Sequence, residues 1–97
     1  MYARVTTVEF ETAADRVAAL KLMSDEVERI RGMHGFHAAY FLDVDELRIV
    51  SIVMFVTEPQ LQRIRDEDEA VRDRLGGAGV TFSDAEECRV MAFASEA

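Results

Sequence analysis

The chain has 97 residues, and its 11 basic against 19 acidic residues leave a net charge of −8. This length allows one domain, residues 1–97, and the acidic balance argues against nucleic acid or an anionic membrane surface as a partner. No apolar run approaches the roughly 18 residues of a transmembrane helix, and no basic-then-apolar start indicates a secretory signal. The single cysteine, Cys88, cannot form an intramolecular disulfide. Together these features predict a cytoplasmic protein.

The first third of the chain predicts a strand followed by a helix. Residues 2–10 are rich in Val and Thr and end at an acidic turn, which is typical of a strand. Thr12 with Asp15 three residues later resembles a capping box and predicts a helix from Ala13 to about Gly32. Helical spacing assigns a set of apolar positions to its buried stripe: Ala13, Val17, Leu20, Val27 and Ile30.

Two strands are expected next. Residues 36–42 form one apolar segment, residues 43–46 form a polar reversal, and residues 47–56 form the most apolar run in the chain. A strand that is apolar on both faces should be buried on both.

A second helix and a last strand complete the chain. The helix begins at Thr57-Glu58-Pro59-Gln60, which combines a cap, a first-turn proline and a box residue. Its acidic run, residues 66–69, is expected to be a solvated face. The stretch Gly76-Gly77-Ala78-Gly79 ends the helix, and residues 86–94 are predicted to form the last strand.

The resulting order, β-α-β-β-α-β, predicts an α+β, ferredoxin-like domain. Its four-stranded antiparallel sheet should have the order 4-1-3-2, with both helices on one face. The other face still carries apolar residues, and an exposed apolar face of that size indicates a partner. We therefore expect a homodimer in which the two sheets pack face to face.

Three segments resemble a known family. They are the opening Met-Tyr-Ala-Arg-Val-Thr-Thr, the strand containing Gly35-Phe36 and Tyr40-Phe41-Leu42, and the third strand running into Thr57-Glu58-Pro59-Gln60-Leu61. Across nearly its whole length the chain is similar to the antibiotic biosynthesis monooxygenase-like domains of the dimeric α+β barrel superfamily. The resemblance implies a ligand pocket between the sheet and the helices. It also implies activities that range from cofactor-free oxidation of aromatic polyketides to haem degradation.

The residues that carry catalysis in the characterised members of this family are Asn, Trp and His. This chain contains no Asn and no Trp, and Arg4, Ile64 and Arg74 stand at the corresponding positions. Haem degradation is therefore not expected, and no cofactor is predicted.

Arg4 is the most informative candidate for substrate binding, because a charge in a central strand must be paired or face a wet cavity. Tyr2 and Thr6 share its face of the strand by alternation. One interpretation is a pocket wall in which Arg4 binds an anionic or enolate oxygen while Tyr2 and Thr6 donate hydrogen bonds. The alternative is an ion pair between Arg4 and an acid of the last strand, Glu86 or Glu87.

His37 and Tyr40 are the candidate catalytic residues, as a base and as a hydroxyl donor or acid. The alternative places His37 simply at the start of a strand and Tyr40 in the core with its hydroxyl at the rim. A metal site is not predicted, because His34 and His37 have no third ligand nearby in the sequence.

Two functions remain open from the sequence, and whether the protein is an enzyme is not decided. The first is a small cofactorless monooxygenase acting on an aromatic or quinone-like molecule, with a pocket of about 300 Å³ or more. The alternative is a non-catalytic dimeric module for ligand binding or interaction.

Overall fold

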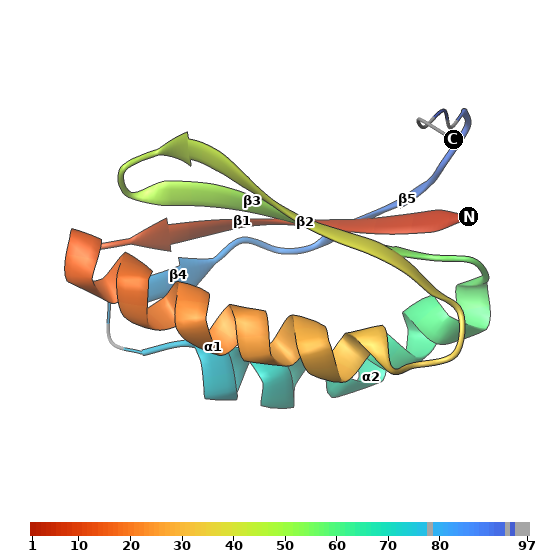
Figure 1. Ribbon diagram of the computed structural model, residues 1–97, viewed down its shortest axis with the longest axis horizontal. Coiled ribbons are helices and arrows are strands. Elements are labelled where there is room, and N and C mark those ends of the chain that lie inside the picture. Colours follow the sequence, from red (N-terminus) through yellow and green to blue (C-terminus); the bar gives the residue numbers. More distant parts are fainter. Residues whose placement is uncertain (78, 93, 95–97) are drawn as a thin grey trace.

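The computed structural model describes residues 1–77, 79–92 and 94. Figure 1 shows two layers, a twisted sheet and a pair of helices that both lie on one of its faces. The elements along the chain are β1 (Tyr2–Phe10), α1 (Ala13–Arg31), β2 (Phe36–Asp45), β3 (Arg48–Phe55), α2 (Glu58–Leu75), β4 (Val80–Phe82) and β5 (Glu86–Arg89).

The sheet confirms the predicted ferredoxin-like architecture. Its antiparallel strands follow the order β2-β3-β1-β4, and β5 pairs with β1. The predicted order 4-1-3-2 is therefore correct, with β1 and β3 in the centre. The last strand begins at Glu86 and pairs with β1 as predicted, but it ends at Arg89 instead of residue 94, and the prediction missed the short strand β4 before it. Residue 93 of the predicted strand lies outside the described residues.

The edge of the sheet next to β1 is divided between β4 and β5, because each of these strands is shorter than β1. β4 pairs with the end of β1 at Val8–Phe10, and β5 pairs with its beginning at Tyr2–Val5. Between the two, Thr7 donates its backbone N–H to Ser83 Oγ at 2.9 Å, and Ser83 donates its own to the Thr7 carbonyl at 2.8 Å. A side-chain oxygen thus replaces one rung of the ladder, and the chain turns before pairing resumes.

Both helices begin as the sequence predicts. At the start of α1, Asp15 donates its backbone N–H to Thr12 Oγ1 at 3.1 Å, and its carboxylate accepts the Thr12 N–H at 3.2 Å. At the start of α2, Gln60 Oε1 accepts the Thr57 N–H at 3.0 Å. Gly35, just before β2, has φ +85°, and a Cβ there would lie 2.4 Å from Gln60 Cδ. The α2 cap and the β2 turn therefore constrain each other.

The buried stripe of α1 differs from the prediction. Val17 is 70% exposed, and Ala13 is also on the outside. Ile30 of the predicted stripe is buried, and Leu20 packs against the core. The other buried positions of the helix are Ala19, Met23 and Glu26. The predicted stripe is therefore wrong at its start and correct at Leu20 and Ile30, and the buried face includes an acid.

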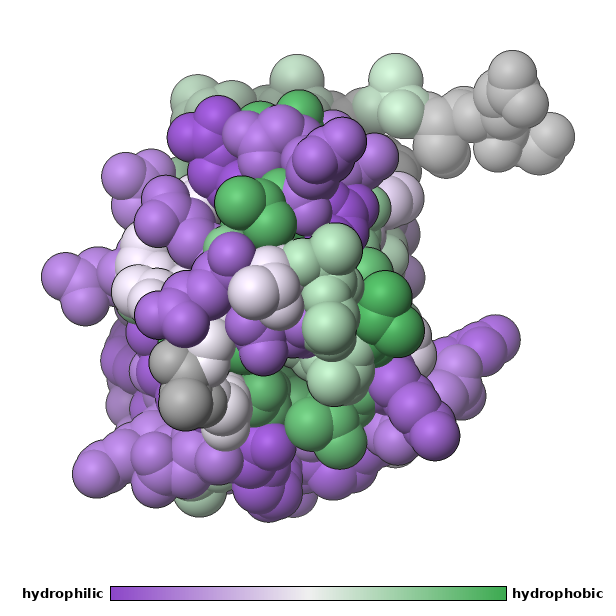
Figure 2. Space-filling view, turned by 90° about the vertical axis from the view of Figure 1, so that its left-hand side faces the viewer, coloured by the Kyte–Doolittle hydropathy of each residue, from purple (hydrophilic) through white to green (hydrophobic). Residues whose placement is uncertain are grey.

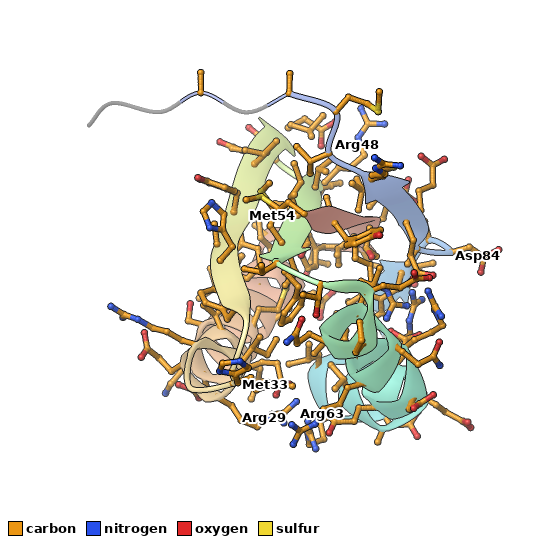
Figure 3. All side chains as sticks on the ribbon, turned by 90° about the vertical axis from the view of Figure 1, so that its right-hand side faces the viewer. Arg29, Met33, Arg48, Met54, Arg63 and Asp84 are labelled. Carbon is orange, nitrogen blue, oxygen red and sulfur yellow. The ribbon has the colours of Figure 1, made fainter. Side chains whose placement is uncertain are left out.

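The core lies between the sheet and the helices, as the end-on view in Figure 3 shows, and it is divided in two. One cluster is at the end where β1 meets α1, around Val8, Phe10 and Ile49. The other is at the opposite end, around Phe55 and Leu61. A continuous apolar core would join them, so what lies between the clusters requires an explanation.

The other face of the sheet has no helix on it. Tyr40, Leu42 and Val44 of β2 are between 46% and 49% exposed there. The space-filling view in Figure 2 shows hydrophobic residues reaching the surface among hydrophilic ones at one end of the molecule. None of the helices in the described part of the chain is long and apolar enough to cross a membrane.

Candidate functional site

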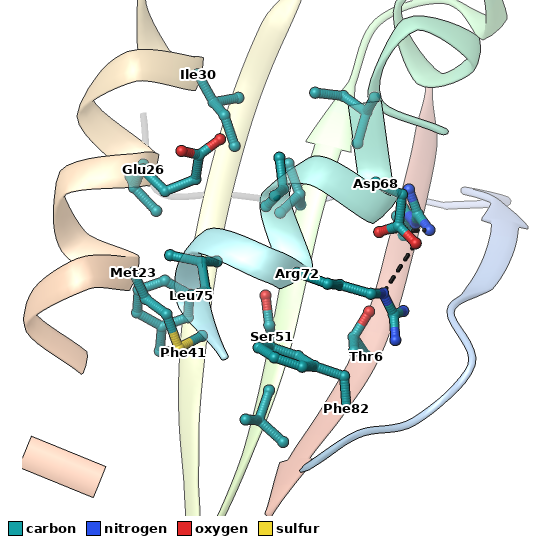
Figure 4. A pocket seen from close by; sticks show the side chains of 16 residues that line it. Thr6, Met23, Glu26, Ile30, Phe41, Ser51, Asp68, Arg72, Leu75 and Phe82 are labelled. Carbon is teal, nitrogen blue, oxygen red and sulfur yellow. Dashed lines mark hydrogen bonds and ion pairs between the residues drawn. The ribbon is translucent and has the colours of Figure 1, made fainter. Parts of the chain in front are cut away.

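A cavity of about 100 Å³, here called the inner cavity, lies between the two core clusters. Its wall includes members of both clusters, among them Val8, Met23 and Ile30. Sheet and helices all contribute to it (Figure 4). Its walls are mainly apolar, and its polar lining residues are Arg4, Thr6, Glu26, Ser51, Asp68 and Arg72. The core is thus interrupted where each layer places polar residues at mid-length.

The strand register explains why the space exists. Thr6 of β1 lies directly opposite Ser51 of β3, and Ser51 lies opposite Phe41 of β2. Two small hydroxyl residues therefore stand side by side in the central strands, where large apolar residues would otherwise fill the layer. Close-packed interiors leave few voids of this size, so the small pair indicates space kept open at this point.

Arg4 is the buried charge of the inner cavity, with a side chain only 10% exposed. Its Nη2 lies 3.1 Å from Asp68 Oδ1 on α2. Its Nη1 is buried and has no hydrogen-bond partner. An unsatisfied buried donor costs about 1–3 kcal/mol, and more on a charged group. A ligand oxygen is one group that would remove this cost.

The predicted ion pair between Arg4 and a β5 acid is wrong. Glu87 does lie opposite Arg4 in the β1–β5 register, but its carboxylate accepts from Arg65 Nε of α2 at 2.8 Å. Because α2 crosses this edge of β1, it supplies both the acidic partner of Arg4, which is Asp68, and the basic partner of Glu87, which is Arg65. The Glu87 hydrogen bond raises the pKa of Arg65, which stays cationic throughout the physiological range.

Asp68 holds two arginines at once. Its Oδ1 pairs with Arg4, and its Oδ2 accepts from Arg72 Nε at 2.8 Å (dashed in Figure 4). The Arg72 guanidinium in turn lies 5.5 Å from the centre of the Phe82 ring, within range of a cation–π contact. We call Asp68 with its two ion pairs the Asp68 bridge. The prediction that residues 66–69 are simply a solvated face is therefore wrong at Asp68.

Glu26 is the second acid of the inner cavity, and its side chain is buried, with 10% exposed. Arg29 Nε donates to its Oε1 at 2.9 Å, and Arg74 Nη2 of α2 lies 3.2 Å from its Oε2. The hydrogen bond to Glu26 raises the pKa of Arg29 above its ordinary value. The contribution of the Arg29 charge to stability is consequently lost on the alkaline side only in strong alkali, as the pH rises through this raised pKa. Glu26 thus joins α1 to α2 beside the inner cavity.

A second space, here called the outer hollow, adjoins the inner cavity and has a volume of about 450 Å³. The two spaces share Arg4, Asp68 and Arg72 as lining residues. The rest of its lining is acidic apart from one alanine: Glu69, Asp73, Asp84 and Ala85. The mainly apolar inner cavity therefore lies next to the polar outer hollow, and the residues of the Asp68 bridge line both.

The structure brings together only some of the predicted site residues. Arg4 and Thr6 line the inner cavity. Tyr2 shares their face of β1 but packs against the core cluster around Phe55. His37 is exposed at an irregularity in the β2–β3 pairing, and Tyr40 lies opposite Ile52 on the helix-free face. Neither belongs to the lining of the inner cavity.

The sequence interpretation missed Glu26 and Asp68, although a signal was present. Each acid occupies a position in an apolar stripe with steps of three and four. The stripes read Ala19, Met23, Glu26, Ile30 on α1 and Leu61, Ile64, Asp68, Val71, Leu75 on α2. An acid in such a register points inward and requires a buried partner. Among the described residues, no group of His, Cys, Asp and Glu is arranged to hold a metal ion.

Comparison with known proteins supports the fold. No protein-family model and no curated protein sequence matches this chain. Solved structures do match over almost the whole length. A dimeric ferredoxin-like protein from an uncultured marine organism has a TM-score of 0.70 at 14% identity and covers 99% of this chain and 100% of its own.

Two further matches are oxygenases. SnoaB, a cofactor-independent oxygenase from Streptomyces nogalater, has a TM-score of 0.70 at 12% identity, covering 98% of this chain and 97% of its own. The monooxygenase from the gene ActVA-Orf6 of Streptomyces coelicolor, solved with nanaomycin D, has a TM-score of 0.60 at 20% identity, covering 97% and 92%. The chain thus has the fold of the antibiotic biosynthesis monooxygenase-like proteins. Identities this low establish the shared fold alone.

Proposed function

We propose that this protein binds an aromatic or quinone-like small molecule between its sheet and its helices and oxidises it with O₂ without a cofactor. The observation that carries the proposal is Arg4, a buried guanidinium whose Nη1 has no partner beside an apolar cavity. The fold shared with cofactor-independent oxygenases supports the same reaction class.

The chemistry required of Arg4 is stabilisation of a ligand anion. An aryl ketone with an adjacent CH₂ group loses a proton to become an electron-rich enolate, which reacts with O₂. One oxygen atom then enters the product as a carbonyl, and the other leaves as water with the two hydrogens of the CH₂ group. A guanidinium in an enclosed, low-dielectric site favours the enolate, because its charge meets a fixed donor there.

The volume of the inner cavity limits the ligand. At about 100 Å³ it is smaller than the 300 Å³ expected from the sequence. An engineered cavity of about 150 Å³ holds one benzene molecule. Because the inner cavity is smaller than this, even a single aromatic ring would extend past the Asp68 bridge into the outer hollow.

We also propose that the working unit is a homodimer formed through the helix-free faces. The chain exposes 6347 Å², whereas a compact monomer of its mass exposes about 5,600 Å². The apolar side chains Tyr40, Leu42 and Val44 are exposed on that face. Burying them against a second copy removes apolar area from water, which is the usual driving force of such interfaces.

Oxygen consumption tests the proposed reaction. An oxygen electrode would follow the protein with anthrone and with a substituted hydroquinone, against the Arg4→Met variant and against buffer. We expect steady O₂ uptake and quinone formation that depend on Arg4. Uptake equal to the buffer rate with every such substrate would refute the enzymatic function.

A second candidate function is ligand binding without turnover. It is favoured by the lining of the inner cavity, which contains neither His nor Tyr among the described residues. Its two acids, Glu26 and Asp68, are each held by two arginines. Ligand binding with no oxygen consumption would select this function.

A further inference from the structure

The inner cavity and the outer hollow are separate spaces with three lining residues in common, Arg4, Asp68 and Arg72. Those three residues are the members of the Asp68 bridge. The inner side of the bridge faces mainly apolar side chains, whereas the outer side faces Glu69, Asp73 and Asp84. The bridge therefore lies between the two spaces, at the residues that line both of them.

The charges of the bridge do not balance. One carboxylate, Asp68, serves two guanidinium groups, so the cluster has a surplus of one positive charge. This surplus of positive charge is assigned to Arg4, because its Nη1 is buried and has no hydrogen-bond acceptor. Arg72 is also a partner of the Phe82 ring and is 25% exposed, whereas Arg4 is 10% exposed. The position that lacks a negative charge is thus the inner one, on Arg4.

We propose that Asp68 is the specificity-determining residue of this site: it occupies Arg4 in the free protein and is displaced from it by the anionic oxygen of a phenol-like or enol-like ligand that arrives through the outer hollow. This inference rests on the proposed binding function and defines its ligand class. A ligand without such an oxygen cannot replace Asp68 on Arg4. Asp68 then keeps its pair with Arg72, which stays seated on Phe82.

The acids of the outer hollow add a second selection. Glu69, Asp73 and Asp84 repel ligands that are already anionic in solution. A weak acid avoids this repulsion because it enters neutral. Its O–H bond then breaks on Arg4, the oxygen keeps the electron pair and accepts from Nη1 and from the Nη2 that Asp68 releases, and the proton leaves to water in the hollow. The ligand class is therefore a neutral, ring-bearing weak acid with one ionisable hydroxyl.

The test compares two probes of similar shape, 4-nitrophenol and 4-nitroanisole, of which only the first can ionise. Binding is measured by calorimetry, and the phenolate absorption band reports ionisation of bound 4-nitrophenol at a pH where the free probe is mostly neutral. The decisive variant is Asp68→Asn. We expect it to bind 4-nitrophenol about tenfold more tightly, because the charged competitor for Arg4 is gone. Binding of 4-nitroanisole should change by less.

The matched control is Asp73→Asn, which removes the same charge from the lining of the outer hollow at a residue that is not a member of the bridge. Because the Asp73 charge acts on Arg4 through solvent, we expect Asp73→Asn to raise the affinity for 4-nitrophenol by less than about threefold. An equal gain in both variants would show a general electrostatic effect and would overturn the assignment of Asp68. Weaker or unchanged binding of 4-nitrophenol to Asp68→Asn would also overturn it.

A measurement on the unmodified protein keeps the proposal testable if Asp68→Asn does not fold. The ¹⁵N–¹H resonance of Arg4 Nε should shift on addition of 4-nitrophenol, because Arg4 exchanges Asp68 for the ligand oxygen, whereas that of Arg72 Nε should shift less, because Arg72 keeps its pair with Asp68. A shift of neither resonance despite binding would refute displacement. No binding of either probe at millimolar concentration would refute the proposed ligand site itself, whereas binding without O₂ uptake would refute only the oxygenase reaction.

Discussion

Replacing Arg4 by methionine should abolish anion binding and leave the stability of the protein almost unchanged. The substitution removes the 3.1 Å ion pair with Asp68. Exposed pairs contribute about 0–1 kcal/mol, and breaking a buried pair costs about 3–5 kcal/mol. Asp68 is 32% exposed and keeps Arg72, so the loss here should be about 1–2 kcal/mol.

The stability that the Arg4→Met substitution recovers is of similar size. Arg4→Met also removes the buried Nη1 that has no acceptor, which recovers about 1–3 kcal/mol. Methionine places an unbranched apolar side chain against the walls of the inner cavity without a new polar atom. The two contributions nearly cancel at the middle of their ranges, and the ranges place the free energy of unfolding between about 1 kcal/mol below and about 2 kcal/mol above the original value. Each 1 kcal/mol corresponds to a Tm change of about 4–8 °C for a domain of this size.

Urea unfolding followed by circular dichroism measures this difference, at one fixed protein concentration because association contributes to apparent stability. A double-mutant cycle with Asp68→Asn isolates the energy of the ion pair itself. Destabilisation by more than about 3 kcal/mol would refute the reasoning, because it would show that Arg4 is held for structure. In that case the unpaired Nη1 would no longer indicate a ligand.

Three further predictions concern the turn, the cap and the open face. Gly35→Ala should lower the free energy of unfolding by about 1–3 kcal/mol in urea titrations, because φ is +85° there and the new Cβ would meet Gln60; an unchanged midpoint would contradict this geometry. Thr12→Ala should cost about 1 kcal/mol through loss of the α1 cap, whereas Thr12→Ser should restore most of it. Leu42→Glu should shift the mass measured by light scattering from dimer to monomer, and a mass that stays dimeric would place the interface elsewhere.

The elements and their order could be predicted because local signals determine them. The Thr12–Asp15 and Thr57–Gln60 pairs cap their helices as expected. The apolar run of β3 correctly indicated that this strand lies in the centre of the sheet. The broken edge was not predictable in this way, because it depends on how far β1 extends beyond each partner and on Ser83 reaching Thr7. The segment after Arg89 is apolar in sequence but continues no strand over the described residues.

The candidate site was predicted in part, for a physical reason. Arg4 and Thr6 could be identified because strand alternation places them on one face with Val8. Tyr40 could not be placed correctly, since a period of two assigns residues to two faces without saying which face the helices cover. The partner of Arg4 could not be predicted either, because Asp68 is distant in sequence and only the crossing of α2 brings its Oδ1 to 3.1 Å from Arg4 Nη2.

The sequence by itself therefore determined the capped helices, the strands, the sheet order and the presence of a charge that a central strand cannot bury alone. Those features depend on hydrogen bonds and periodicities that span a few residues. Only the tertiary structure decided which face of the sheet encloses a cavity, that Glu26 and Asp68 point inward, and that one carboxylate holds two arginines. The acidic balance that first argued against nucleic acid also has a local meaning, since four of those acids line the outer hollow.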